Sequence, residues 1–435
     1  MIKAGAAKIE ITPPAGIPLA GYGCREKKSE KIDDPLYTKS LILSSSKTKI
    51  IIITNDLIGI PRDLSKKVRD ILNKKIKIPQ DNILICASHT HYGPVLKPFY
   101  NRKVKAYVEN LIKKMVECAL SSYENLKEAK IKFGKKKIYK KISYNRDTKR
   151  HDGKVEMSFY YPEGRKDLIF GPVDKDLMVI DVEDKNGRPI ATLVNFACHP
   201  VCHCSSLYSI SSNYPGYMME YVENFKKNIC LFTLGAAGNI VPFRREIPER
   251  EKMGEYLGKK VIEISSSAEE IEDEEFKILK SFILLPLKQI PPAEKIKKEI
   301  EEREKIIEKM ENSDFPSFCA EKGKISSLKI LLKKAKRKYN PKFVKTEIQI
   351  FKIGNGIVVG LPGEIFTEIG MEIKKYSPFK FTMVISLSND SLDYIPTSEA
   401  YECGGYEAEN TKIAPGADKI ILERVYRLID RLNSA

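Results

Sequence analysis

The sequence predicts an α/β fold in which mixed β-sheets are layered with flanking helices. Along the 435 residues, short apolar, β-branched runs alternate with longer amphipathic runs, as strands alternate with helices in this class. Two pairs of apolar runs are joined by Asn-Gly, which is typical of neighbouring strands connected by a tight turn. Chemically distinctive side chains follow several of these runs directly. We therefore expect a single domain over residues 1–435, with its functional groups at the ends of strands.

The individual elements follow from local composition. The expected strands are apolar and β-branched over most of their length, which indicates burial on both faces. The expected helices place apolar residues three and four positions apart. In chain order, the strands lie within 49–58, 82–88, 176–199, 228–234, 347–364 and 381–390, and the segments 176–199 and 347–364 each hold two strands around an Asn-Gly turn. The clearest helices are 104–126 and, near the end of the chain, 416–433.

The fold prediction includes one inserted element, a charged helical hairpin at about 291–340. The runs "PAEKIKKEIEEREKIIEKM" and "SLKILLKKAKRKY" have a helical pattern, and the segment "ENSDFPSFCAEKGK" between them is expected to be a loop. A hairpin inserted between strands is either a solvated excursion or a lid over the functional site.

Charge and hydropathy narrow the classes of function. The net charge is +17, from 75 Lys and Arg against 58 Asp and Glu. The excess Lys is spread among Glu and Ile without a nucleic-acid-binding signature, so we expect a Lys/Glu-rich surface of the thermophile type and no nucleic-acid partner. The alternative, a nucleic-acid binder, predicts steeply salt-dependent binding. No stretch reaches the ~18 apolar residues of a membrane span, and the N-terminus lacks a signal core, so we expect a cytoplasmic protein without a stable membrane anchor.

Cysteines are numerous, but their pattern does not predict a metal site. Nine cysteines, an odd number, indicate reduced thiols rather than a disulfide framework. The stretch "CHPVCHC" (198–204) has spacings that do not match the paired ligands of a structural zinc site. We therefore interpret Cys198 as a packing residue. Cys202, His203 and Cys204 are expected to be bystanders or, at most, to line the approach to a metal.

Histidines give the strongest chemical signal. The chain has only five, and four of them fall in the two groups "SHTH" and "CHPVCH". His89 and His91 follow a strand, where alternate residues share a face, so both are expected to point the same way. His199 ends another strand and is a third candidate. A catalytic zinc needs further ligands, and Glu364, directly after a strand and a Pro-Gly pair, is the natural oxygen donor. The alternative for Glu364 is a role at the start of the helix that follows.

Nine short segments lie in one order over most of the chain: "AAKIEITPPAGIPLAGYG", "DDPLYTKSLIL", "ASHTHYGP", "YNRD", "NFACHPV", "NYPGYM", "GAAGN", "LPGE" and "EAYECGGYEAE". Together they resemble the neutral (alkaline, non-lysosomal) ceramidase family, specifically its N-terminal catalytic domain. The resemblance implies one Zn²⁺ per chain. When the ligand positions of the family are transferred to the matching motifs of this sequence, the implied ligands are His89, His199, Glu364 and Tyr406. Tyr406 is implied by the resemblance alone.

The resemblance also implies roles around the metal. His91 and Arg146 match positions beside the metal and the substrate, so His91 is expected to act as general acid and base and Arg146 to orient substrate oxygen. The turn "GAAGN", with Gly235, Gly238 and Asn239, is either a small oxyanion nest or a tight connection that needs small residues.

Two departures from the family pattern shape the expected chemistry. Where the family carries a "GDxSP" element with a serine proposed as nucleophile, this chain has "GNIVP", and the serine position holds Val241. Valine has no nucleophilic atom, so zinc-activated water is the expected nucleophile. No C-terminal immunoglobulin-like domain of the ceramidase type is expected in this chain.

The resulting expectation is a zinc-dependent hydrolase that cleaves the amide bond of a small-molecule N-acyl substrate, ceramide or another. The alternatives are a carboxylic ester hydrolase and a non-catalytic zinc-containing homologue with a binding or regulatory role.

Overall fold

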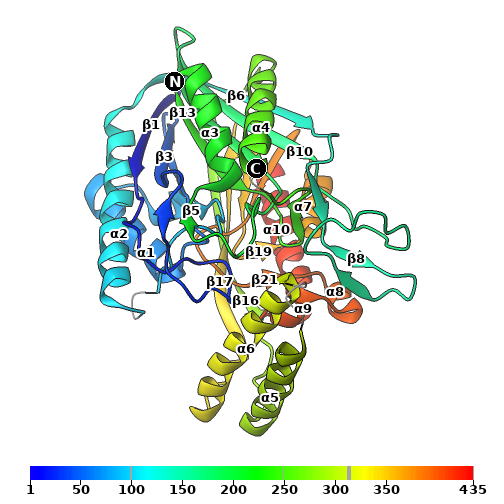
Figure 1. The fold of residues 1–435 in the computed structure, drawn as a ribbon. Helices are drawn as coiled ribbons and strands as arrows, with labels where there is room; N and C mark the ends of the chain where they lie inside the picture. Colours follow the sequence, from blue (N-terminus) through cyan, green and yellow to red (C-terminus); the bar gives the residue numbers. More distant parts are fainter. Residues whose placement is uncertain (98–99, 247, 311–314, 435) are drawn as a thin grey trace.

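Two β-sheets packed face to face, with helices on both outer sides, make up the body of the protein (Figure 1). The computed structural model describes residues 1–97, 100–246, 248–310 and 315–434. The predicted α/β class with mixed sheets is confirmed. No helix in these described ranges is long and apolar enough to cross a membrane.

The larger sheet has nine strands, and most neighbouring strands in it are antiparallel. The pairs β4–β5 and β11–β13 are parallel. The strand order is β13-β11-β10-β6-β1-β3-β4-β5, and β15 pairs with β6. The strands are β1 (Lys3–Glu10), β3 (Tyr37–Ser44), β4 (Lys49–Asn55), β5 (Ile83–Ala87), β6 (Lys127–Lys137), β10 (Asp176–Asp184), β11 (Pro189–Phe196), β13 (Ile229–Leu234) and β15 (Glu269–Glu270).

The smaller sheet has the order β16-β17-β18-β20 and is also mixed. Its strands are β16 (Phe276–Pro286), β17 (Phe343–Ile353), β18 (Gly356–Gly360) and β20 (Phe381–Ile385). The remaining strands are short and form two-stranded sheets. They pair β2 (Lys31–Ile32) with β12 (Ser209–Ile210), β7 (Ser143–Asn145) with β14 (Ile240–Pro242), β8 (Asp147–Lys149) with β9 (Val155–Met157), and β19 (Glu364–Ile365) with β21 (Tyr394–Ile395).

Helices cover both outer faces of the two sheets. On the larger sheet these are α1 (Arg62–Ile76), α2 (Arg102–Glu124), α3 (Asn213–Lys226) and α4 (Glu249–Ser266). On the smaller sheet they are α7 (Thr367–Tyr376) and α10 (Ala417–Asn433). Three short helices lie between these elements: η1 (Gln80–Asn82), α8 (Ser398–Cys403) and α9 (Tyr406–Asn410).

The run of four isoleucines in β4 shows why the strands are apolar throughout. Ile51 and Ile53 pack in the core formed with α1 and α2, whereas Ile50 and Ile52 pack in the core between the two sheets. Alternate residues of a strand point to opposite faces, so a strand buried on both faces needs apolar residues at every position. Each fully buried isoleucine contributes about 1.5–3 kcal/mol relative to an exposed one.

The inserted hairpin consists of α5 (Ala293–Lys309) and α6 (Phe315–Lys336), and it projects from the body between β16 and β17 (Figure 1). Its helices share a small core of Ile296, Ile300, Ile325 and Leu328. The expected loop at 311–324 is wrong in extent, because α6 already begins at Phe315; residues 311–314 lie outside the described ranges. Pro316 falls in the first turn, where a helix tolerates proline.

Candidate metal centre and active site

The predicted site residues come together where strands of both sheets end. His89 follows β5 and His199 follows β11, while Glu364 follows β18 as the first residue of β19. The strands β5 and β13 stand at opposite ends of the strand order, yet one segment of the smaller sheet bridges their ends. After β20, the amide of Ser386 donates to the carbonyl of Leu234, at the end of β13, and that of Asn389 donates to the carbonyl of Ile85 in β5. The two edges of the large sheet therefore meet at the site.

His89 and His91 point into the same space, but strand alternation is not the reason. The strand β5 ends at Ala87, and His89 has a φ of 70°. A left-handed backbone at a residue other than glycine stores strain, and such strain collects at functional sites. The bend brings the Nε2 atoms of His89 and His91 to 3.3 Å from each other.

His89, His199 and Glu364 form the centre of the cluster. The Nε2 atoms of both histidines lie 3.1 Å from the same carboxylate oxygen, Oε2 of Glu364. On the opposite ring edge, Nδ1 of His89 lies 2.6 Å from the carbonyl of Ile58, and Nδ1 of His199 lies 2.7 Å from the carbonyl of Ala237. A carbonyl only accepts, so each Nδ1 carries the proton and each Nε2 presents a lone pair.

This donor set fits a metal ion. Two imidazole lone pairs and a carboxylate oxygen converge at this centre. All three are electron-pair donors that face one another, and a cation between them would bind all three. Four ligands placed tetrahedrally around Zn²⁺ at its usual bond lengths lie about 3.3 Å from each other, close to the separations seen here. The carbonyls behind the two rings fix the tautomers, as the outer partners of metal-binding histidines do.

The three buried histidines, His89, His91 and His199, by themselves form a group able to hold a metal ion, because their ligand atoms all lie within 4.8 Å of one another. His91 is therefore placed either as a ligand or, as the sequence predicts, beside the metal. Its Nδ1 is buried and has no hydrogen-bond partner among the residues that the structure describes.

Charge and burial set the protonation of the cluster. Burial lowers the pKa of His199 to about 4, although the nearby carboxylate of Glu364 acts in the opposite direction and raises it. Burial also lowers the pKa of His91, and the neighbouring histidines add to the effect. Burial alone would raise the pKa of Glu364, but His89 and His199 hold it well below its usual value. At neutral pH His91 and His199 are therefore neutral and Glu364 is a carboxylate, the forms that bind metal.

Sequence analysis missed one tyrosine, Tyr394. In the pair of β19 and β21 it stands directly opposite Glu364. Its ring centroid is 6.5 Å from that of His199, and burial raises its pKa well above the usual value. The predicted Tyr406 lies beside it: its ring centroid is 6.1 Å from that of Tyr394, it also packs edge-on against Phe159, and burial raises its pKa to about 12. Tyr394 lies in β21, nine residues after the end of β20, so the strand-end rule that found the histidines did not single it out.

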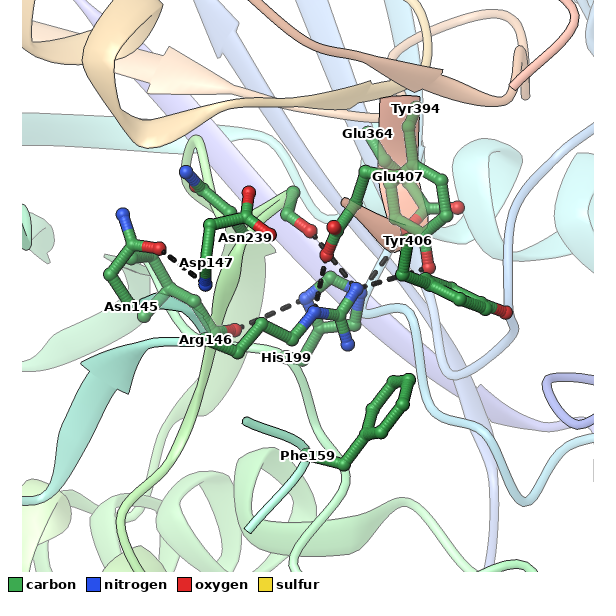
Figure 2. Close-up of polar contacts among 12 residues, drawn as sticks. Asn145, Arg146, Asp147, Phe159, His199, Asn239, Glu364, Tyr394, Tyr406 and Glu407 are labelled. Carbon is green, nitrogen blue, oxygen red and sulfur yellow. Dashed lines mark hydrogen bonds and ion pairs between the residues drawn. The ribbon is translucent and has the colours of Figure 1, made fainter. Parts of the chain in front are cut away.

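Arg146 lies at the centre of Figure 2, between β7 and β8. Its Nε donates to Glu407 at 2.5 Å, and its Nη2 donates to the hydroxyl of Tyr394 and to the carbonyl of Gly238, each at 3.2 Å. Burial alone would lower the pKa of Arg146, but the Glu407 carboxylate raises it. Glu407 is a second residue that sequence analysis missed.

A second buried carboxyl stands behind this ion pair. Burial, and then the charge of Glu407, raise the pKa of Asp147 well above its usual value. Within the described part of the chain, Asp147 and Glu407 each keep one buried oxygen without a hydrogen-bond partner. Burial and the nearby Glu407 carboxylate therefore favour the protonated form of Asp147.

The predicted oxyanion turn has its glycine amides engaged. The amide of Gly235 donates to the carbonyl of Phe196, and that of Gly238 donates to the carbonyl of Ile365 at 2.7 Å. A Cβ on Gly238 would lie 2.7 Å from the carbonyl oxygen of Glu364. The side chain of Asn239 accepts from the amide of Thr367 and donates to Glu368. These contacts favour the alternative of a tight connection, which positions Glu364 through its neighbours.

Val241 is fully buried and packs with Tyr144 and Val201. Its side chain supplies packing at the position where the resemblance places a serine. Cys198 and Cys202 also lie in the core, as predicted for Cys198, whereas His203 and Cys204 are partly exposed.

A cavity of about 80 Å³ opens beside the cluster. His91, Arg146, Tyr394 and Tyr406 line this cavity. Residues of α6 also line it, together with Cys24, Cys204 and Arg245. The helical hairpin therefore forms a wall of the space in front of the candidate metal centre.

Comparisons with known proteins agree with this architecture. The family described as "Neutral/alkaline non-lysosomal ceramidase, N-terminal" matches residues 2–236. The neutral ceramidase of Pseudomonas aeruginosa is 22% identical over 294 residues, a match that covers 61% of this chain and 42% of that protein.

Solved structures show the same fold. The crystal structure of that ceramidase superposes with a TM-score of 0.74 at 18% identity, over 99% of this chain and 75% of the other. A ceramidase complexed with C2 superposes with a TM-score of 0.75 at 17% identity, with the same coverage. The family match spans more than half of the sequence, and the chain therefore belongs to the neutral/alkaline non-lysosomal ceramidase family, in its N-terminal part.

Proposed function

We propose that this protein is a zinc-dependent hydrolase that cleaves the amide bond of a small-molecule N-acyl compound with water as the nucleophile. The observation that carries the proposal is the convergence of two imidazole lone pairs and a carboxylate oxygen, with 3.1 Å from each Nε2 to Oε2 of Glu364. Membership of the ceramidase family supports the choice of an amide bond.

His89, His199 and Glu364 would hold the ion, with a tyrosine as fourth ligand. Tyr406 is the tyrosine that the family motif implies, and the position of Tyr394 opposite Glu364 supports Tyr394 as its competitor. A bound zinc supplies an activated water and polarises the scissile carbonyl. The zinc content of Tyr394→Phe and Tyr406→Phe separates the two assignments, because only the variant that lacks the ligand hydroxyl should bind zinc more weakly.

The other residues of the site handle protons and charge. Neutral His91 would take a proton from the attacking water and return it to the leaving amine. Arg146 is held against the site by Glu407, and it presents positive charge where negative charge develops on the substrate oxygen. Arg245 lines the same cavity and donates to the carbonyls of Val201 and Phe159, and among the described residues no carboxylate pairs with it. The positive charge therefore favours an anionic transition state.

The test combines metal analysis with a substrate screen. Purified protein loaded with zinc should contain about one zinc per chain, and His89→Ala or Glu364→Ala should lose it. The loaded protein is then offered ceramides, N-acyl amino acids and N-acyl amino sugars of varied acyl length. Release of the free amine supports the proposal, while normal metal content in both variants would falsify the site.

Two other functions remain as outcomes of the same screen. Turnover of esters but not amides identifies a carboxylic ester hydrolase. Stoichiometric zinc without any turnover identifies a non-catalytic homologue, which the apolar packing of Val241 at the serine position favours.

A further inference from the structure

Three of the nine cysteines gather at the mouth of the cavity in front of the candidate metal centre. Cys24, Cys204 and Cys319 all line this cavity and are all partly exposed. Five others, in contrast, are buried in the core. Partly exposed thiols are the ones that small oxidants reach.

Two of these thiols come from segments far apart in sequence. Cys319 lies on α6 of the hairpin, and Cys24 lies in the loop that follows β1. The two thiols are close enough for each to shift the pKa of the other, and Sγ of Cys319 lies 3.1 Å from Oγ of Ser205. The pair therefore joins the hairpin to the body of the protein.

The backbones around this pair approach closely. A Cβ on Gly23 would lie 2.7 Å from the Cα of Gly323, so the loop and α6 touch at two glycines. Gly323 is four residues after Cys319 and lies on the same face of the helix. An ion pair between Lys322 and Glu26 forms a further link across this contact.

The loop that carries Cys24 also holds His91. A Cβ on Gly21 would lie 2.6 Å from Cβ of His91, and the ring of Tyr22 packs edge-on against the His91 ring at 4.9 Å. Nη1 of Arg25 donates to the carbonyl of His91. A bond at Cys24 therefore ties α6 to the segment that positions the acid/base histidine.

We propose that Cys24 and Cys319 form a reversible disulfide that fixes α6 across the mouth of the cavity. Its oxidant is a low-molecular-weight disulfide. The Cys24 thiolate attacks one sulfur of that disulfide and releases one small thiolate. The thiolate of Cys319, its proton given to water, then attacks the Cys24 sulfur and releases the second. Two protein thiols are oxidised, and one small disulfide is reduced to two thiols.

The protonation of Cys24 suits it to the attacking role. The hydrogen bond with Cys319 is the largest cause that lowers its pKa, to about 7. About half of Cys24 is then thiolate at neutral pH, whereas an ordinary cysteine is a few per cent ionised. The pKa of Cys204 is also lowered, to about 6: burial raises it, but hydrogen bonds to His203 and Ser206 outweigh burial. Cys204 is therefore the competing thiol that a test must separate.

The bond would act on entry to the site. The cavity of about 80 Å³ is far smaller than the several hundred Å³ typical of pockets for drug-sized ligands, so α6 must shift for a larger substrate to reach the metal. With the disulfide formed, that shift is blocked. This effect on turnover rests on the proposed function, whereas the bond itself does not.

The test uses the full chain, incubated with oxidised glutathione and then alkylated. Peptide mapping without reduction should show Cys24 linked to Cys319 in wild type and in Cys204→Ser and Cys403→Ser. Neither Cys24→Ser nor Cys319→Ser should show an internal bond. Hydrogen exchange of α6 should slow about tenfold on oxidation and recover with dithiothreitol.

The outcomes separate this inference from the proposed function. A bond of Cys24 or Cys319 to Cys204, glutathione adducts alone, or unchanged exchange of α6 in the linked protein would each overturn the inference. For a protein shown to hydrolyse a substrate, oxidation should lower kcat/KM about tenfold in wild type but not in Cys319→Ser. If no substrate is found, the mapping and exchange results still decide whether the bond forms and fixes α6.

Discussion

At the scale of single residues, the site depends on which ring atom of each histidine carries a proton. Backbone carbonyls take the Nδ1 protons of His89 and His199, so both Nε2 lone pairs face Glu364. In an apolar interior such a set of acceptors is costly without a cation between them. The arrangement of these donor atoms is one that could hold a metal ion.

The first prediction concerns pH. The pKa of His199 is about 4 in the folded chain, below the ordinary value of 6.5, so protons compete with metal only in strong acid. Zinc should stay bound at about pH 5.5, where an ordinary histidine is mostly protonated. The lowered pKa also means that stability contributed by neutral His199 is lost as pH falls from 6.5 toward 4. Metal content after dialysis at several pH values checks this, and half-loss near pH 6.5 would contradict it.

The second prediction separates the two roles open to His91. If it is the general acid and base, His91→Gln should keep its zinc and lose about 10²- to 10⁴-fold in kcat. If it is a ligand, the same variant should lose the metal. His203→Gln is the matched control, because His203 is partly exposed and outside the cluster. Metal content and turnover are measured on both variants.

At the scale of elements, α6 is the part of the fold whose extent depends on a tertiary contact. Proline and glycine in "ENSDFPSFCAEKGK" predict a loop, yet residues from Phe315 onward are helical. Gly323 is a poor helix former by propensity, but it lets α6 lie against Gly23. The packing at this crossing thus overrides the local signal.

The third prediction uses the two glycines as a matched pair. A Cβ on Gly23 would meet the Gly323 backbone at 2.7 Å, whereas a Cβ on Gly323 would lie 3.8 Å from Gly23, an ordinary contact. Gly23→Ala should therefore displace α6 and speed its hydrogen exchange. Gly323→Ala should leave α6 in place and stabilise the helix by up to about 1 kcal/mol. Equal exchange rates in the two variants would show that the crossing does not hold the hairpin.

At the scale of the whole molecule, one buried network joins the helices on the large sheet to the small sheet. Arg69 of α1 pairs with Glu347 of β17 and donates to Oε1 of Gln349 at 3.1 Å. Its Nε also donates to the carbonyl of Ile83 in β5. The network therefore ties together three layers close to the strand that delivers His89.

The fourth prediction tests that network. Arg69→Met leaves the carboxylate of Glu347 buried without its partner and should lower the free energy of unfolding by about 3–5 kcal/mol. Removing both charges, in Arg69→Met with Glu347→Leu, should restore much of the loss. Arg427→Met is the control, because its ion pair with Glu423 is exposed and should contribute little. Denaturant unfolding of the wild type, of Arg69→Met, of the double variant and of Arg427→Met measures these differences.

The sequence by itself determined the class of the fold and the residues that we propose as the main ligands. Apolar runs fix the strands because both sheet faces are buried, and polar groups that directly follow such runs must lie at sheet edges. His89, His199 and Glu364 could be found on that ground alone. Tyr394 does not directly follow a strand of the larger or the smaller sheet, and it does not stand out among 21 tyrosines.

Only the tertiary structure decided how these edges meet and what lies around them. The segment after β20 brings the ends of β5 and β13 together, and the strained backbone at His89 turns its ring toward Glu364. The pairing of Arg146 with Glu407, 261 positions away, and the contact of Cys24 with Cys319 join distant segments. Local sequence carries no record of such contacts, because they depend on how the sheets and the hairpin pack.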